Sequence, residues 1–438
     1  MTRARAAALL IAATLIAYQG ALTAGFVLDD YHYVLEHHEL GVGLIPRLFW
    51  RAYQSGNASF YRPLSTADLA LDRTLFGLWA PAFHAHNLVW HLAATLALYA
   101  LCRRLLDGRA AFVTALLFAL HPLHTEAVTG VIGRTELMAA CFVFVGCALW
   151  LDGRRGPAAL AYLAALLSKE SGVMLPLVAL MLDGRARPLP GALRRAWPLA
   201  LALAGYALLR VHALAGATLP QPAEYFAVAT TGQSLVTALD VLGRDLALLV
   251  WPHPLCADYS YPALPIASWP RAAATVAALA LLVGLARRWR PLSWGLGWFA
   301  LTVLPVSNLV VHIGVLMAER LLYLPSVGLC LVGGAASSVL AARARPAVAQ
   351  AAVATVALSF TALTMSRNLD WQTPLSLWRD TVAKQPDSAL AHGNLALSCL
   401  VVGDRVCARS QFERAVTLDP SRADFRRALD ELSPPPAP

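Results

Sequence analysis

The chain has 438 residues, of which 58% are hydrophobic and only 14% are charged, and its mean hydropathy is +0.57. This composition excludes an ordinary soluble domain and indicates a membrane protein with several spans. The formal net charge of +9 would suit nucleic-acid binding, but the arginines lie in short loops between apolar runs. That distribution is typical of membrane topology, so we expect no nucleic-acid partner.

The first apolar run follows Arg3 and Arg5 and covers about residues 6–25. We interpret it as an uncleaved signal anchor with the amino terminus inside, and a cleaved secretory signal is the alternative. Asp29 and Asp30 follow shortly after this run. Because a carboxylate in hydrocarbon is costly, the pair should face water, a partner or a substrate, unless it only marks the end of the helix.

Most predicted spans are near the roughly 20 residues that a bilayer needs, and the two short ones, 157–168 and 171–183, are expected to extend into their flanks or to tilt. Eleven are expected, at about 6–25, 85–105, 110–127, 135–151, 157–168, 171–183, 196–214, 272–286, 293–311, 321–341 and 347–364. With the amino terminus inside, the arginine clusters between them fall on the cytoplasmic side. Segment 235–251 is interrupted by charged residues, so we interpret it as an interfacial helix within an external region at 215–271. The other external parts are a first loop at 26–84 and the carboxyl-terminal tail.

Charged motifs that are far apart in the sequence fall at one external level in this topology. They contain Asp29 and Asp30, Arg62, His121, His124 and Glu126, Arg134 and Glu136, Lys169 and Glu170, and Glu319 and Arg320. Taken singly, each motif could have a purely structural role, as a snorkelling pair, an interfacial ion pair or a helix cap. Together they suit a phosphorylated lipid, with cations holding the phosphate and a carboxylate removing a proton from an incoming hydroxyl.

The tail at 366–432 fits the helix–turn–helix repeat called TPR. The pattern places His392, Leu395, Ala396, Gly403, Ala408, Phe412, Ala415 and Pro420 at repeat positions. About one and a half repeats are too few for independent stability, so the tail should rest on the membrane domain, a second copy or a partner. Cys399 and Cys407 are the only plausible disulfide pair. The proline-rich end, 433–438, is expected to be disordered.

At this point the chain resembles the transmembrane and TPR-repeat-containing (TMTC) proteins, which are GT-C-fold glycosyltransferases. The resemblance is carried by FVLDD at 26–30, YRPL at 61–64, FHAHNLVWHL at 83–92, HPLHTEAVTGVIGRTEL at 121–137, SKESG at 168–172, DYSYPALP at 258–265, MAERLLYLPSVG at 317–328 and RNLDW at 367–371. It implies an all-α GT-C-like transmembrane domain at 1–365 and transfer of mannose from a polyprenyl phosphate to a protein hydroxyl. The chain departs from the family in its short repeat region. Its alanine- and arginine-rich composition suggests a bacterial member, placed in the inner membrane with a periplasmic tail.

The mechanism implied by the resemblance is a single displacement with inversion at the anomeric carbon. Asp29 would be the general base, and Asp30 would orient it or the acceptor. The donor phosphate would be held by Arg134, Lys169 and Arg320. The sugar or acceptor would be bound by Arg62, His121, His124, Glu126, Glu136, Glu170 and Glu319. No cofactor is assigned, because no tight ligand spacing demands a metal. A divalent metal could still bind to Asp29 together with Glu126 and the two histidines.

Three alternatives stay open. The chain could be a non-catalytic TPR scaffold for envelope proteins. It could be a transporter of lipid-linked sugars, which the location of the charges at one membrane face disfavours, since transporters bind near the midplane. It could also be an enzyme of this type that acts on a glycan or lipid acceptor instead of a protein.

Overall fold

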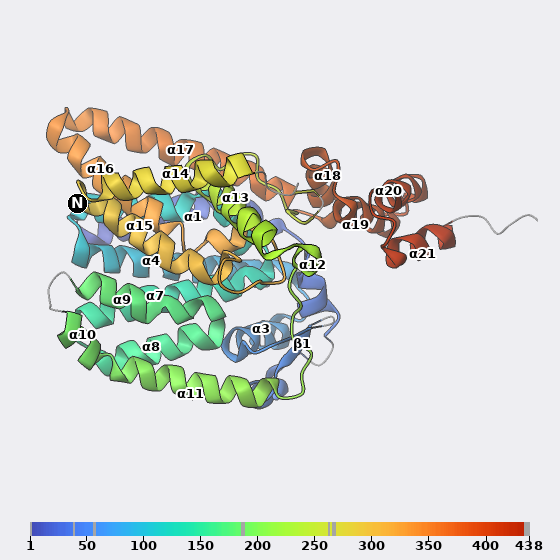
Figure 1. Ribbon diagram of the computed structural model, residues 1–438, viewed down its shortest axis with the longest axis horizontal. Helices are drawn as coiled ribbons and strands as arrows, with labels where there is room; N and C mark the ends of the chain where they lie inside the picture. The colour runs from blue at the N-terminus through green and yellow to red at the C-terminus, as the bar shows by residue number, and fades with distance from the viewer. Residues whose placement is uncertain are drawn as a thin grey trace, which may run out of the picture.

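Figure 1 shows the computed structural model of the chain, which describes residues 2–37, 40–55, 58–184, 189–261, 263–264 and 269–432. The segment predicted to be disordered, 433–438, lies outside these residues. Within the described ranges the structure is helical apart from one antiparallel hairpin, formed by β1 (Tyr53–Ser55) and β2 (Ala58–Phe60). The all-α prediction is therefore confirmed, with the hairpin as a small addition.

Long helices lie side by side and form a bundle (Figure 1). They are α1 (Arg3–Tyr18), α4 (Ala80–Leu105), α5 (Gly108–Leu120), α7 (Arg134–Leu151), α8 (Arg155–Ser168), α9 (Leu175–Asp183), α11 (Trp197–Leu214), α13 (Thr231–Val250), α14 (Trp269–Ala286), α15 (Arg290–Val303), α16 (Val327–Arg343) and α17 (Pro346–Asp370). The amino terminus lies at one end of the bundle, and the carboxyl-terminal helices project from the other, which we call the tail end.

Shorter elements connect these helices. They are η1 (Gln19–Thr23), η2 (Tyr31–Leu35), η3 (Val42–Leu44), α2 (Ile45–Leu48), α3 (Pro63–Phe76), η4 (Pro122–His124), α6 (Thr125–Thr129), η5 (Val131–Gly133), η6 (Glu170–Met174), α10 (Leu189–Arg195), α12 (Glu224–Val228), η7 (Leu304–Val306) and η8 (Glu319–Leu322). The charged motifs found in the sequence lie mostly on these short turns, where the chain reverses between long helices.

Six stretches in the described part of the chain are long and apolar enough to cross a membrane: Arg3–Thr23, Ala80–Leu105, Val131–Leu151, Trp197–Leu214, Trp269–Ala286 and Pro346–Asp370. The pair Gly108–Leu120 and Pro122–Thr129, bent by 50°, would make a seventh. The chain is thus a membrane protein. Eleven spans are not confirmed, because α8, α9, α15 and α16 have only 14, 9, 14 and 17 residues, short of the roughly 20 that a bilayer needs.

Helix α7 lies at the centre of the bundle and packs against α4, α8 and α9. Small residues on α8 (Ala158, Ala161 and Ala165) are buried, which lets the two backbones approach closely. Helices α15 and α16 approach even more closely at Gly295 and Gly328, where a Cβ on either residue would lie 2.4 Å from the carbonyl oxygen of the other. A side chain at these two positions would force the helices apart.

The tail consists of α18 (Pro374–Lys384), α19 (Ala389–Val401), α20 (Arg405–Leu418) and α21 (Ala423–Leu432). A disulfide joins Cys399 on α19 to Cys407 on α20, which confirms the predicted pair. The small and aromatic repeat positions are buried between these helices: Ala396, Ala408, Phe412 and Ala415. Their burial agrees with the TPR pattern, and the assignment of the tail as a TPR solenoid stays a prediction.

The tail rests on the rest of the chain. Arg367, near the end of α17, pairs with Asp380 of α18 at 2.7 Å. Lys384 donates to the Leu255 carbonyl at 2.8 Å, and the Ser388 hydroxyl donates to Asp258. Of the three supports expected for so short a repeat, contact with the membrane part is therefore present.

Candidate functional site

Asp29 and Asp30 sit in the loop between η1 and η2, and their environments differ sharply. Asp30 is only 1% exposed. Its carboxylate accepts the backbone N–H of Val27 at 3.1 Å and that of Ile132 at 3.0 Å. The Asp29 side chain is 52% exposed and lies 3.6 Å from the guanidinium of Arg320. Of the two adjacent acids, Asp29 can therefore meet a substrate, and Asp30 ties the loop to η5.

Burial dominates the electrostatics of Asp30. It raises the pKa of this carboxyl to about 7, although the N–H groups of Val27 and Ile132 act in the opposite direction. The turn that presents the Ile132 N–H needs glycine at its end. A Cβ on Gly133 would lie 2.0 Å from the carbonyl oxygen of Ala127. Gly133, the first residue of the GRTE motif, therefore allows the turn that presents the Ile132 N–H to Asp30.

The residue before Asp29 has an unusual backbone. Leu28 has φ of +52°, in the left-handed region that branched residues rarely adopt. Its side chain packs against Trp371 and Leu377 and against the tail cluster that contains Trp378. A non-glycine residue in this region costs about 1–3 kcal/mol and persists only where the surroundings hold it. The tail thus helps to hold the loop that carries Asp29.

Arg320 connects the aspartate loop to the HPLHTE motif. Its side chain forms an ion pair with Glu126, and its backbone N–H donates to the same carboxylate at 2.8 Å. Glu126 is nearly buried, and the guanidinium is about a quarter exposed. Burial would lower the pKa of Arg320, but the charges of Glu126 and Asp29 outweigh it and raise this pKa. Arg320 is thus a fixed cation beside Asp29.

A second group of charges lies within electrostatic reach of Arg320. Lys169 forms an ion pair with Glu136. Burial lowers the pKa of Lys169, Glu136 counteracts this effect, and the positive charges of Arg62 and Arg320 lower the pKa further. Lys169 of the SKE motif thus pairs with Glu136 of the GRTE motif, and Arg62 and Arg320 lie close enough for their charges to act on it.

Glu170 binds two arginines in the same region. Arg62 and Arg210 each lie 3.0 Å from its carboxylate. Burial raises the pKa of Glu170, but the two guanidinium groups outweigh it and bring this pKa to about 2. Arg210 was not among the predicted site residues. Its position inside the apolar run 196–214 could have indicated it, because an ionisable residue in such a run needs a partner.

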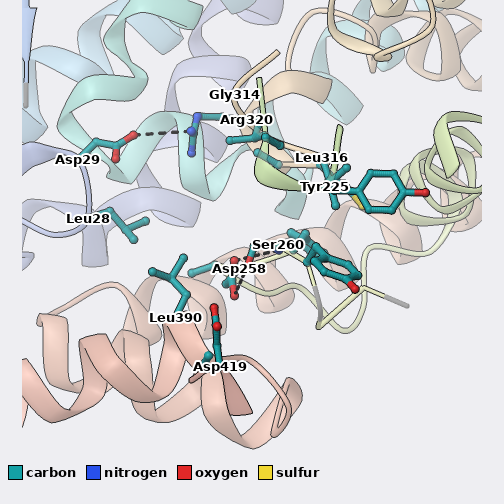
Figure 2. Close-up of a pocket in the computed structure, with 18 of the residues that line it drawn as sticks. Leu28, Asp29, Tyr225, Asp258, Ser260, Gly314, Leu316, Arg320, Leu390 and Asp419 are labelled. Carbon is teal, nitrogen blue, oxygen red and sulfur yellow. Dashed lines mark hydrogen bonds and ion pairs between the residues drawn. The ribbon is translucent and has the colours of Figure 1, made fainter. Parts of the chain in front are cut away.

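Asp29 and Arg320 line a pocket of about 340 Å³ at the tail end. Figure 2 shows them on one side, with Asp258 and the tail residues Leu390 and Asp419 on another. The lining comes from the aspartate loop, the segments around 223–261 and 314–320, and the tail. The candidate base thus faces a cavity that four separate parts of the chain build.

Other predicted site residues lie inside the fold. Arg134 is fully buried, and its guanidinium contacts Asp68 at 3.0 Å, Asp72, the Asn87 side chain at 2.8 Å and the Phe83 carbonyl at 2.9 Å. The guanidinium donates its hydrogen bonds to these protein groups, and Arg134 does not line the pocket. A phosphate-binding role for Arg134 would require this network to open.

The two histidines and Glu319 are likewise buried. The ring of His121 contacts the Leu249 carbonyl at 2.9 Å, and that of His124 contacts the Ser326 hydroxyl at 2.9 Å. Glu319 accepts hydrogen bonds from the Tyr259 hydroxyl and the Cys256 backbone. Burial raises the pKa of Glu319 to about 7, with the Arg367 charge acting against it. These residues join segments of the fold to one another.

Metal ligation was left open by the sequence. Among the described residues, no three His, Cys, Asp or Glu side chains are grouped so that they could hold a metal ion. Of the acids near Asp29, Glu126 is engaged with Arg320 and Glu136 with Lys169, whereas Asp30 accepts backbone N–H groups.

Comparison with known proteins gives several relatives, although no family model matches the chain. "Protein O-mannosyl-transferase Tmtc3" of Drosophila melanogaster is 27% identical over 510 residues, which cover 93% of this chain and 54% of the relative. "Protein O-mannosyl-transferase F38B6.6" of Caenorhabditis elegans is 28% identical, with 94% of this chain and 62% of the relative covered. Human "Protein O-mannosyl-transferase TMTC1" is 27% identical, with 98% and 57% covered.

The similarity extends over almost the whole chain and supports the resemblance to the TMTC type. The chain spans only between 54% and 62% of the length of these relatives. All three come from animals, so they do not support the expectation of a bacterial member.

Proposed function

We propose that the chain is a membrane glycosyltransferase of the TMTC type. It moves a mannose-like sugar from a polyprenyl phosphate to a hydroxyl group, that of a Ser or Thr of an exported protein. The names of the relatives support mannosyl transfer to protein, and the apolar helices support a membrane enzyme. The observation that carries the proposal is Asp29, a half-exposed carboxylate that is paired with Arg320 and lines a pocket.

In the proposed reaction Asp29 is the general base. It takes the proton of the acceptor hydroxyl while the acceptor oxygen attacks the anomeric carbon. The bond from that carbon to the phosphate oxygen breaks, and the phosphate leaves with the electron pair. A single displacement of this kind inverts the anomeric configuration. A general base typically contributes about 10²–10⁴-fold in rate.

The leaving phosphate needs positive charge more than it needs a proton. Arg320 and Lys169 supply it in this proposal, with Arg62 and Arg210 behind them. Glu126, Glu136 and Glu170 hold these cations in place, as their ion pairs support. Arg134, His121, His124 and Glu319 take no part in the reaction, since they are fully or nearly buried in the fold.

The arginine distribution supports the orientation of the molecule. The amino terminus lies inside, and the tail end faces the outside, where an exported protein would meet the pocket. The tail forms one wall of that pocket through Leu390 and Asp419, which supports a protein acceptor over a small one.

The test uses the purified full chain in lipid bilayers with a panel of polyprenyl-phosphate sugars and Ser- and Thr-containing proteins. Mass spectrometry then identifies the glycosylated product. We expect transfer from one donor, and a loss of about 10²–10⁴-fold in the Asp29→Asn variant. The matched control is Asp152→Asn, which removes another half-exposed aspartate that is paired with an arginine, Arg104. Absence of transfer from every donor would favour the non-catalytic scaffold, whereas full activity of Asp29→Asn would refute Asp29 as the general base.

A further inference from the structure

A second cavity lies away from the proposed active site, near the amino terminus. Its volume is about 610 Å³, and it is lined by residues of α1, α4, α5 and α17. Figure 1 shows the amino terminus at the end of the bundle opposite α18–α21. Neither the proposed reaction nor any predicted site residue uses this cavity.

Three arginines from three helices line this cavity. Arg3 belongs to the first turn of α1, Arg103 to the last turn of α4 and Arg109 to the first turn of α5. In the described part of the chain none of the three has a carboxylate within ion-pair distance, whereas the neighbouring Arg104 pairs with Asp152 at 2.7 Å. Three cations that converge without an acid repel one another unless an anion joins them.

The acid closest in sequence does not neutralise this cluster. Asp107 is the N-cap of α5, and its carboxylate accepts the backbone N–H groups of Arg109 and Ala110. It also accepts the hydroxyl of Ser338 at 3.0 Å. Those bonds hold the start of α5 in place, and no carboxylate of the described residues pairs with the three arginine side chains.

Arg103 carries a second, independent sign of a missing partner. Its Nε is buried and has no hydrogen-bond partner among the residues that the structure describes. The guanidinium lies against Gly108, where a Cβ would be 2.3 Å from one of its nitrogens. The glycine therefore leaves room for the arginine over the start of α5. A buried charged donor without an acceptor is costly, so an anion in this cavity would stabilise it.

Below the arginines the lining is apolar. Phe112, Val113 and Leu116 of α5 face Val353 and Ala354 of α17 across the cavity. Arg109 and Leu116 are seven residues apart on α5, which corresponds to about 10 Å along the helix axis. The cavity is therefore cationic at the end of the bundle and apolar deeper among the helices.

We propose that this cavity binds an anionic phospholipid. The guanidinium groups of Arg103 and Arg109 hold the lipid phosphate, and Arg3 closes the site from α1. One acyl chain lies along Phe112 and Leu116. Arginine suits this role because its planar fork binds phosphate oxygens in pairs. Basic pockets between membrane helices are known to hold anionic head groups. A free phosphate would use the arginines but not the apolar part.

The experiment measures lipid retention by native mass spectrometry of the full chain, purified in a neutral detergent. The probes are phosphatidylglycerol, phosphatidylcholine, glycerol phosphate and inorganic phosphate. We expect phosphatidylglycerol to bind at least about tenfold more tightly than each of the others, as charge-assisted contacts combined with apolar burial predict. The double variant Arg103→Gln/Arg109→Gln should lose this preference.

Two further variants separate the site from a general surface effect. Leu116→Trp fills the apolar part without changing the charge, and it should weaken phosphatidylglycerol but not glycerol phosphate. Arg343→Gln/Arg345→Gln removes two exposed arginines that do not line the cavity, and it should behave as the unmodified chain. Equal binding of both phospholipids, equal binding of inorganic phosphate, or an unchanged preference in the Arg103→Gln/Arg109→Gln variant would overturn the proposal.

Discussion

The carboxylate of Asp30 accepts the backbone N–H of Ile132, which lies 102 residues further along the chain, at 3.0 Å. This single bond, with the one from Val27, separates two adjacent aspartates that look alike in the sequence. Asp30 is buried, whereas the half-exposed Asp29 lies 3.6 Å from the Arg320 guanidinium. The position of the proposed base therefore depends on a turn in a distant motif.

The first prediction concerns pH. The pKa of Asp30 is raised to about 7 from about 4 in an unfolded chain, so the folded state binds more protons between these values. Stability should therefore fall as pH rises from about 4 to about 7. In Asp30→Asn this dependence should be weaker, because the variant has no proton to lose. Thermal unfolding of both chains at pH 5 and pH 8 measures the difference.

Glu319 complicates this measurement, since burial also raises its pKa to about 7. The variant Glu319→Gln is therefore measured in parallel, and the double variant should be the least pH-dependent. Asp152→Asn serves as the control. Arg104 lowers the pKa of Asp152, so this variant should leave the dependence of stability on pH between about 4 and 7 unchanged. If Asp30→Asn kept the full pH dependence, Asp30 would be ionised in the folded state.

The second prediction links the tail to catalysis. Leu28 packs against the cluster that contains Trp378, and this packing holds its left-handed backbone. We expect Trp378→Ala to lower kcat more than it changes KM, because the Asp29 loop would relax. Phe412→Ala is the matched control: it removes a buried aromatic residue in a separate tail cluster. Each should destabilise the chain, by up to about 3–5 kcal/mol for a large aromatic residue. An equal loss of kcat in both variants would contradict a specific role of Leu28.

The sequence predicted that several charged motifs lie close together, but it did not predict which of their side chains are buried. The convergence of the motifs followed from topology alone, and Arg320, Glu126, Lys169 and Glu136 indeed form neighbouring ion pairs. The fate of Arg134 could not be predicted, because its partners Asp68 and Asp72 lie on α3, inside a segment expected to be an external loop. The sequence around Arg134 contains no pattern that shows its burial, because the residues that bind it come from a distant helix.

The predicted number of spans is not confirmed for a related reason. Hydropathy marks apolar segments, but it does not say where a helix breaks. Pro122 and His121 stand at the bend between α5 and α6, and η7 ends α15 at Val303. A segment predicted from hydropathy as one span is therefore divided between a helix and a turn. As a result, several helices are shorter than the apolar run that contains them.

The third prediction tests the structural role of Arg134. Arg134→Met would leave Asp68 and the buried Asp72 without their cation. Breaking a buried pair on one side costs about 3–5 kcal/mol, so the chain should unfold at a clearly lower temperature. Adding Asp72→Asn should restore part of this stability. The KM for the lipid donor should stay the same in the folded fraction of the variant. If Arg134 bound the donor phosphate, its loss would raise this KM.

The fourth prediction concerns Lys169 and its charge. Burial lowers the pKa of Lys169, and Glu136 is the neighbour that counteracts this most. In Glu136→Gln the pKa of Lys169 should therefore fall further. Only the protonated amine can hold a phosphate, and it is present below its pKa. The alkaline limb of the transfer reaction should consequently shift to lower pH.

Glu170→Gln is the matched control for this shift. Glu170 also lies in the charged cluster, but it pairs with Arg62 and Arg210, and arginines keep their charge over the whole accessible pH range. This variant should weaken donor binding without moving the alkaline limb. The measurement is kcat/KM for the lipid donor against pH in the unmodified chain and both variants. An alkaline limb that Glu136→Gln leaves unmoved would remove Lys169 from the phosphate site, and Arg320 would then stand alone beside Asp29.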